Sequence, residues 1–139
     1  WHQDVKPANI LVSSRQGGSP YEWQFKLADL GFSHFKRAVD GAGEATDHDA
    51  RGSRTYGPPE CYRGDDFMEQ TALKVNPKVD IWSLGCVFSE ALIWIRYGYT
   101  GVKSYRQERK AETDRIPGFK DGDCFHNGLD VLNTVSKWH

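Results

Sequence analysis

The chain of 139 residues lacks an excess of either charge, since 18 basic and 19 acidic side chains leave a formal net charge of −1. Without a basic surplus we expect no nucleic-acid partner. The chain also lacks a long apolar run. The longest, Ala91 to Ile95, is far shorter than the roughly twenty residues of a membrane-spanning helix, so we expect no membrane partner either.

The chain has few cysteines, and they are widely spaced. Cys61, Cys86 and Cys124 are an odd number of residues without a C-x-x-C pair, which argues against a disulfide framework or a zinc ribbon. Cys124 and His126 lie near acidic residues and invite a metal interpretation, but no second pair of ligands is present. With no signal-like amino terminus, we expect an intracellular protein, cytoplasmic or nuclear.

The run HQDVKPAN at residues 2–9, followed by DLG at residues 29–31, carries the chemistry of the chain. Asp4 is a carboxylate that can accept a hydroxyl proton, and Lys6 brings a compact positive charge suited to a phosphate. Asn9 and Asp29 offer the oxygen ligands that magnesium prefers. This set suits phosphoryl transfer, which needs positioning and charge neutralisation more than covalent chemistry.

Two short β-type runs, Asn9 to Val12 and Phe25 to Leu30, flank a cluster of turn-forming residues at 13–20. The pattern predicts a hairpin that holds Asn9 and Asp29 at one end. Its apolar side chains are expected to pack the strands against the rest of the domain; they are Ile10, Leu11, Phe25 and Leu27.

These motifs resemble those of protein kinases. HQDVKPANILV is similar to the H-R-D-L-x-x-x-N catalytic loop, and LADLG to the D-F-G metal-binding turn. RGSRTYGPPE, residues 51–60, resembles the end of the activation segment, and VDIWSLGCVFSEAL, residues 79–92, resembles the helix that follows it. All of these keep the family's order over residues 1 to about 95.

The resemblance implies a mainly α fold with a short β-hairpin, as in the carboxyl-terminal lobe of a protein kinase, here incomplete. Residues 1–139 would be a partial kinase domain; its parts would be a catalytic loop at 2–9, a metal-binding turn at 29–31, an activation segment at 29–60 and a buried helix at 80–95. The expected cofactors are ATP and Mg²⁺, and the expected partner is a protein substrate. The oligomeric state stays open.

By the same resemblance, the catalytic residues are Asp4 as base and Lys6 on the γ-phosphate. Lys6, Asn9 and Asp29 would bind the cofactor, with Asn9 and Asp29 as the metal ligands. Ser53 would support the substrate site. His2, Glu60 and Asp80 would be structural. His2 would pack beneath Asp29 and hold the loop. Glu60 would pair with an arginine that the sequence does not identify. Asp80 either caps its helix or holds the catalytic loop.

Some residues depart from the family pattern. Gln3 replaces the arginine that normally binds a phosphorylated loop residue, so we expect activity that does not require phosphorylation within residues 32–57. Leu30 replaces phenylalanine in D-F-G, and Pro58 replaces alanine in A-P-E; neither change removes the adjacent acidic residue. Hydroxyls in this loop are candidate phosphosites or plain solvated groups; they are Ser33, Thr46, Thr55 and Tyr56.

Three helices are expected after residue 79. Apolar residues from Ile81 to Ile95 recur at three- and four-residue steps and almost all round, which predicts a buried helix. Residues 102–116 are charged and predict an exposed helix with a solvated face. Residues 117–128 read as a loop, and Leu129, Leu132, Val135 and Trp138 as a last helix.

The 139 residues contain neither a glycine-rich phosphate lid nor a V-A-I-K strand, so we expect this fragment alone to be inactive. Lys6 and the G-S-x-x-Y spelling at residues 52–56 resemble serine/threonine kinases, although dual-specificity and small-molecule kinases stay open. Two functions remain: part of an active protein kinase, or a pseudokinase or scaffold lobe that binds partners without catalysis. The intact acidic and amide positions favour the first.

Overall fold

The computed structural model describes residues 1–14, 22–33, 54–61, 76–119 and 122–139. The strands are β1, Ile10–Ser14, and β2, Trp23–Leu27; the helices are α1, Val79–Thr113, and α2, Asn133–Trp138. Short 3-10 turns occur at Pro7–Asn9, Leu30–Phe32, Arg54–Tyr56 and Pro59–Cys61. This agrees with the expected combination of helix and a short hairpin.

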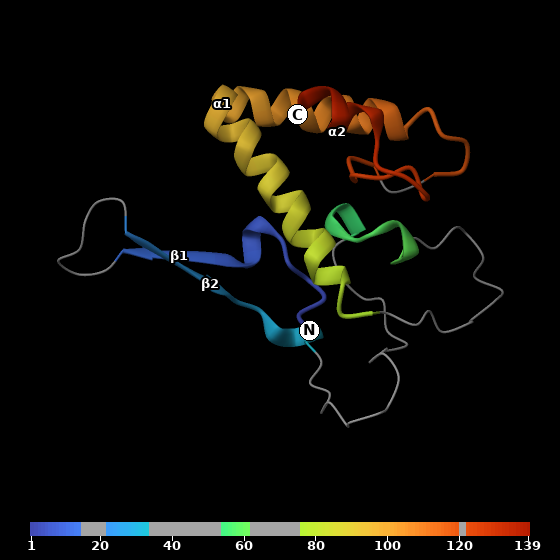
Figure 1. Cartoon of the computed structure of the whole chain (residues 1–139). Helices are drawn as coiled ribbons and strands as arrows, with labels where there is room; N and C mark the ends of the chain where they lie inside the picture. The colour runs from blue at the N-terminus through green and yellow to red at the C-terminus, as the bar shows by residue number, and fades with distance from the viewer. Residues whose placement is uncertain (15–21, 34–53, 62–75, 120–121) are drawn as a thin grey trace.

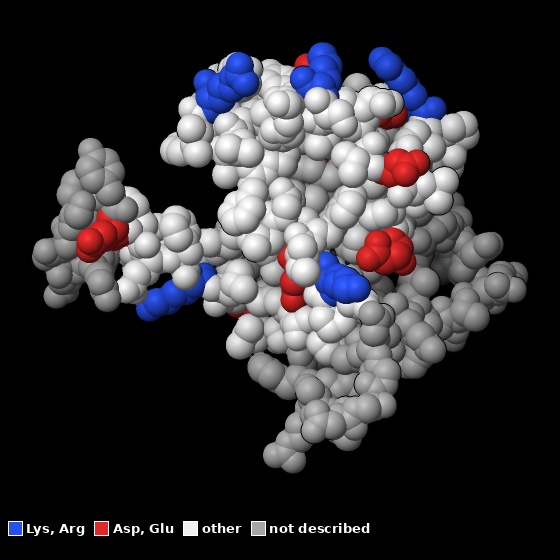
Figure 2. Space-filling model, viewed as in Figure 1, with Lys and Arg blue, Asp and Glu red and all other residues white. Residues whose placement is uncertain are grey.

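The two strands form the predicted hairpin. They are antiparallel, and the register runs from Ile10 opposite Leu27 to Ser14 opposite Trp23. The connection at residues 15–21 lies outside the described part of the chain. Figure 1 shows the paired strands extending away from the helices, and Figure 2 shows them as a narrow projection.

The expectation that the hairpin packs against the domain through its apolar side chains is wrong. Leu11, Phe25 and Leu27 are 56%, 69% and 53% exposed. The physical reason is that neither face of this two-stranded ribbon is covered by another described element, and a lone hairpin has little core of its own.

Helix α1 is bent in its middle (Figure 1). Gly98 has φ of 66° and ψ of −166°, a backbone conformation that only glycine adopts without strain. The bend divides α1 into a first arm, residues 79–97, and a second arm, residues 99–113. The helices predicted at 80–95 and 102–116 are therefore both present, joined by a kink.

The prediction that the first arm is buried is wrong for one of its faces. Ile81, Phe88 and Ile95 are 71%, 59% and 73% exposed, and Leu92 and Trp94 are similarly open. Only the opposite face, with Ser83, Cys86, Glu90 and Ile93, packs on described residues. The apolar pattern is thus real, but the described part of the chain covers a single side of it.

The core lies inside the bend of α1. It consists of Tyr56, Cys86, Ile93, Val102, Tyr105 and Phe125, with Trp82, Val87, Val135 and Trp138 packed around it. Tyr105 is central, with its ring 6.2 Å from Phe125 and 5.6 Å from Trp138. This core joins both arms of α1 to the segments at 54–61 and 122–139.

The prediction of an exposed, solvated second arm is wrong in its central stripe. Val102, Tyr105, Arg109 and Thr113 lie at successive three- and four-residue steps and are 8%, 0%, 0% and 1% exposed. The stripe escaped the sequence pattern because half of it is polar. The last helix is shorter than predicted, since α2 begins at Asn133 and Leu129 lies outside it, 85% exposed.

None of the described helices is long and apolar enough to cross a membrane.

Candidate active site

Asp80, in the first turn of α1, holds the His2–Asn9 segment. Its Oδ2 accepts a hydrogen bond of 2.6 Å from the backbone N–H of His2, and its Oδ1 accepts one of 2.8 Å from that of Gln3. Gln3 has a left-handed φ of 64°, and the bend it makes lets adjacent N–H groups reach one carboxylate. Lys78, at the N-cap of α1, makes no side-chain cap hydrogen bond. Both carboxylate oxygens of Asp80 accept hydrogen bonds from the backbone of the His2–Asn9 segment.

His2 is buried and both of its ring nitrogens are occupied. Nδ1 accepts a hydrogen bond from the backbone N–H of Asp4 at 3.3 Å, so Nε2 carries the proton and donates to the carbonyl of Ala28 at 3.0 Å. The imidazole therefore connects the backbone at Asp4 with the backbone just before Asp29. It therefore fixes the HQDVKPAN segment relative to the DLG turn through hydrogen bonds.

Asp4 is the centre of a compact polar cluster. Its carboxylate Oδ2 accepts a hydrogen bond from Asn9 Nδ2 at 2.9 Å and lies 2.7 Å from Lys6 Nζ. Asp4 is 4% exposed and Asn9 7%, whereas Lys6 sits at the edge with a side chain 26% exposed. A 3-10 turn that starts at Pro7 returns Asn9 beside Asp4. The lysine charge thus lies at the mouth of a buried acid–amide pair.

Asn9 and Asp29 lie at the same end of the hairpin, as predicted. The N–H of Ala28 donates to the carbonyl of Asn9 at 2.9 Å, which continues the ladder one step beyond β1 and β2. Asp29 follows with a left-handed φ of 62°, and its exposed carboxylate accepts a hydrogen bond from Gly31 N–H at 3.3 Å. The backbone pairing brings these distant residues together.

The donor chemistry of this end suits magnesium. The amide nitrogen of Asn9 is committed to Asp4, so Oδ1 is the atom of Asn9 that can bind a cation. The exposed Asp29 carboxylate supplies a hard, charged oxygen. No group of three His, Cys, Asp or Glu side chains in the described residues is arranged to hold a metal, so a cation here would also need oxygens from water or a phosphate.

A buried charge network fixes the segment at residues 54–61. The Tyr56 hydroxyl donates to Glu90 Oε2 at 2.9 Å. Arg106 grips the same carboxylate through Nε at 2.9 Å and Nη2 at 2.8 Å, and Arg109 Nη2 donates to Oε1 at 2.9 Å. Arg109 also donates through Nε to the carbonyl of Asp123 at 3.1 Å. Glu90 thus joins both arms of α1 and the Tyr56 segment in one cluster.

The protonation states in this network follow from burial and charge. Burial opposes the charge on Glu90, but hydrogen bonds from Arg106 and Arg109 outweigh it and hold the pKa of that carboxyl below its usual range. Burial raises the pKa of Tyr56 well above its usual value, and the neighbouring Glu90 adds to this effect. Glu90 is therefore anionic and Tyr56 a neutral donor.

Other expected site residues are placed differently. Ser53 lies outside the described residues. Glu60 is exposed, and no described arginine or lysine forms an ion pair with it. Sequence reasoning missed Glu90, Arg106 and Arg109. The signal available was a glutamate in the middle of a helix that is otherwise apolar almost all round, because a buried carboxylate requires cationic partners.

The protein kinase domain family model matches residues 1–120 of the chain. The chain belongs to the protein kinase family. Cyclin-dependent kinase-like 1 of Caenorhabditis elegans is 36% identical over 91 residues, which is 66% of this chain and 20% of that protein. Cyclin-dependent kinase-like 2 of Mus musculus is 40% identical over 93 residues, 66% of this chain and 13% of that kinase.

A third relative, GLH-binding kinase 1 of Caenorhabditis elegans, is 34% identical over 91 residues, 66% of this chain and 19% of that kinase. The matched part of this kinase chain therefore spans about a fifth or less of these relatives. No solved structure matches the chain.

Proposed function

We propose that the chain is a carboxyl-terminal-lobe segment of a protein kinase that transfers the γ-phosphate of ATP to serine and threonine hydroxyls of a protein. The observation that carries the proposal is the Asp4 cluster. A buried carboxylate binds Lys6 at 2.7 Å and Asn9 at 2.9 Å, at the end of the hairpin where Asp29 lies.

Each group has one task in this proposal. ATP with Mg²⁺, when bound, supplies the transferable phosphoryl group and the cationic charge that offsets its oxygens. Asp4 accepts the proton of the attacking hydroxyl, and Lys6 contributes positive charge to the γ-phosphate. Asn9 Oδ1 and the Asp29 carboxylate hold magnesium. His2 and Asp80 keep these groups in place through the backbone bonds described above.

Serine and threonine are the proposed acceptors for two reasons. Lys6 follows Asp4 by two residues, and residues 52–56, G-S-R-T-Y, resemble the G-T-x-x-Y of serine/threonine kinases with serine in place of threonine. The names of the cyclin-dependent kinase-like relatives support the same class. Ser53, which lies outside the described residues, is proposed to support the substrate site.

We further propose that residues 1–139 do not catalyse transfer alone, because the phosphate lid and its lysine are needed and neither occurs in the printed sequence. The test uses γ-labelled ATP, Mg²⁺ and a generic protein substrate. The chain alone should give no labelled protein, and a longer kinase that contains it should label serine and threonine. Turnover by the chain that is lost on Asp29→Ala would contradict the first part, and labelling confined to tyrosine the second. A longer protein that keeps the fold and labels nothing would indicate the scaffold alternative.

A further inference from the structure

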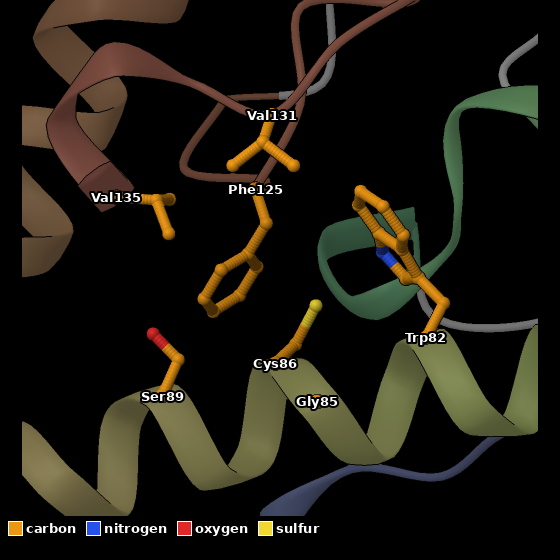
Figure 3. Close-up of a pocket in the computed structure, with 7 residues that line it drawn as sticks. All are labelled: Trp82, Gly85, Cys86, Ser89, Phe125, Val131 and Val135. Carbon is orange, nitrogen blue, oxygen red and sulfur yellow. The ribbon is translucent and has the colours of Figure 1, made fainter. Parts of the chain in front are cut away.

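A pocket of about 200 Å³ opens between the first arm of α1 and the carboxyl-terminal segment, away from the His2–Asn9 segment (Figure 3). Trp82, Cys86 and Ser89 line it from α1, and Phe125, Val131 and Val135 face them from the other side. Apolar cavities of roughly 150 Å³ stay dry and bind benzene-sized molecules. The pocket thus has room for one aromatic ring with a small substituent.

The polar atoms around this pocket are of unequal availability. The Ser89 hydroxyl is shared with Tyr105 Oη and with His139 Nε2, each at 2.7 Å. Burial raises the pKa of the Cys86 thiol to about 12, so it is a neutral, weakly polar group near pH 7. Trp82 Nε1, in contrast, is buried and has no hydrogen-bond partner among the described residues.

The unpaired indole N–H gives the pocket its chemical preference. A buried donor without an acceptor is unfavourable, so an occupant that brings an acceptor is favoured over one of the same shape without it. Figure 3 shows the indole nitrogen on the side of the Trp82 ring that faces the pocket. Charged occupants are disfavoured because the walls are mainly hydrocarbon.

We propose that this pocket binds a small, uncharged aromatic molecule that carries one hydrogen-bond acceptor, with Trp82 Nε1 as the donor. None of the residues that line the pocket belongs to the proposed phosphoryl-transfer site.

The experiment compares acetophenone with α-methylstyrene, which has nearly the same shape but a CH₂ group in place of the carbonyl oxygen. Each is titrated into ¹⁵N-labelled chain 1–139 while the tryptophan indole N–H signals are followed by NMR. Acetophenone should bind about five- to tenfold more tightly, the value of one ordinary net hydrogen bond, and should shift the Trp82 signal most.

Three variants separate the donor from the cavity. Trp82→Phe keeps an aromatic wall and should abolish the preference for acetophenone. Gly85 also lines the pocket, and a Cβ added there meets no atom within 4 Å. Gly85→Leu should therefore place a larger side chain in the pocket and block both ligands. Trp94→Phe, at an exposed tryptophan of the same helix, should change nothing.

Several results would overturn the proposal: equal affinity for the two ligands, no binding of either, or a preference that survives Trp82→Phe. Binding that weakens as the chain concentration rises would assign the pocket to a second copy and would overturn it as well.

Discussion

Replacing Glu90 by glutamine removes the charge on which the buried network depends. The side chain keeps its size and can still accept a hydrogen bond from Tyr56. Arg109, whose side chain is 0% exposed, then keeps its positive charge without the carboxylate that now lies 2.9 Å away. Arg106 is less affected, because its side chain is 44% exposed and water can solvate it.

The expected size of the effect follows from that difference in burial. Removing one partner of a buried ion pair costs about 3 to 5 kcal/mol, whereas an exposed pair is worth less than about 1 kcal/mol. Glu108→Gln is the matched control. It is the same substitution in the same helix, at a carboxylate that pairs with Lys137 at 2.9 Å with side chains 40% and 71% exposed.

The assay is urea unfolding of residues 1–139, followed by circular dichroism. Glu90→Gln should lower the free energy of unfolding by about 3 kcal/mol or more, and Glu108→Gln by less than about 1 kcal/mol. Adding Arg109→Met to Glu90→Gln should recover part of the loss, because the unpaired charge is then gone. Equal effects of the two glutamine variants, or further loss of stability in the double variant, would show that Glu90 does not stabilise the buried charge of Arg109.

Three further predictions concern the kink, the charge network and phosphorylation. Gly98→Ala should destabilise the chain by roughly 1 to 3 kcal/mol because the backbone φ at Gly98 is 66°. Gly85→Ala, in the helix interior with open space around it, should stabilise the chain by up to about 1 kcal/mol. Thermal unfolding of both variants measures these changes. The pKa of Glu90 is lowered in the folded state, so the stability that its charge contributes is present above the unfolded pKa and is lost as pH falls through the folded pKa. The difference in unfolding free energy between wild type and Glu90→Gln should therefore shrink below about pH 4.5, as measured by urea titrations. With Gln3 in place of arginine, phosphatase treatment of a longer kinase that contains this chain should leave its activity unchanged, and loss of activity would contradict the prediction.

The hairpin and the first arm of α1 were predictable from the sequence because their signals are local. β-type runs around a turn cluster predict β1 and β2, and a three- and four-residue apolar period predicts the first arm of α1. The convergence of Asn9 and Asp29 followed from strand pairing alone. Their chemical assignment came from motif resemblance, which periodicity cannot supply.

The kink and the charge network were not predictable because they depend on contacts between distant residues. The sequence does not distinguish Gly98 from an ordinary helical glycine. Its left-handed conformation belongs to a kink that lets both arms of α1 pack around Tyr105. No local pattern predicts the burial of Arg109: this charged residue lies in the core because Glu90, Tyr105 and Phe125 surround it. The exposed apolar face of α1 shows the converse, since periodicity reports amphipathic character without saying what covers it.

The proposed role of Asp4 is tested most directly by the turnover number of a longer kinase that contains this chain, measured with a serine/threonine peptide for the wild type and for Asp4→Asn. The substitution preserves the size of the side chain and removes the proton acceptor. We predict a fall in kcat of at least about 100-fold, with the KM for ATP little changed. A kcat within about twofold of wild type would contradict the assignment of Asp4 as the catalytic base.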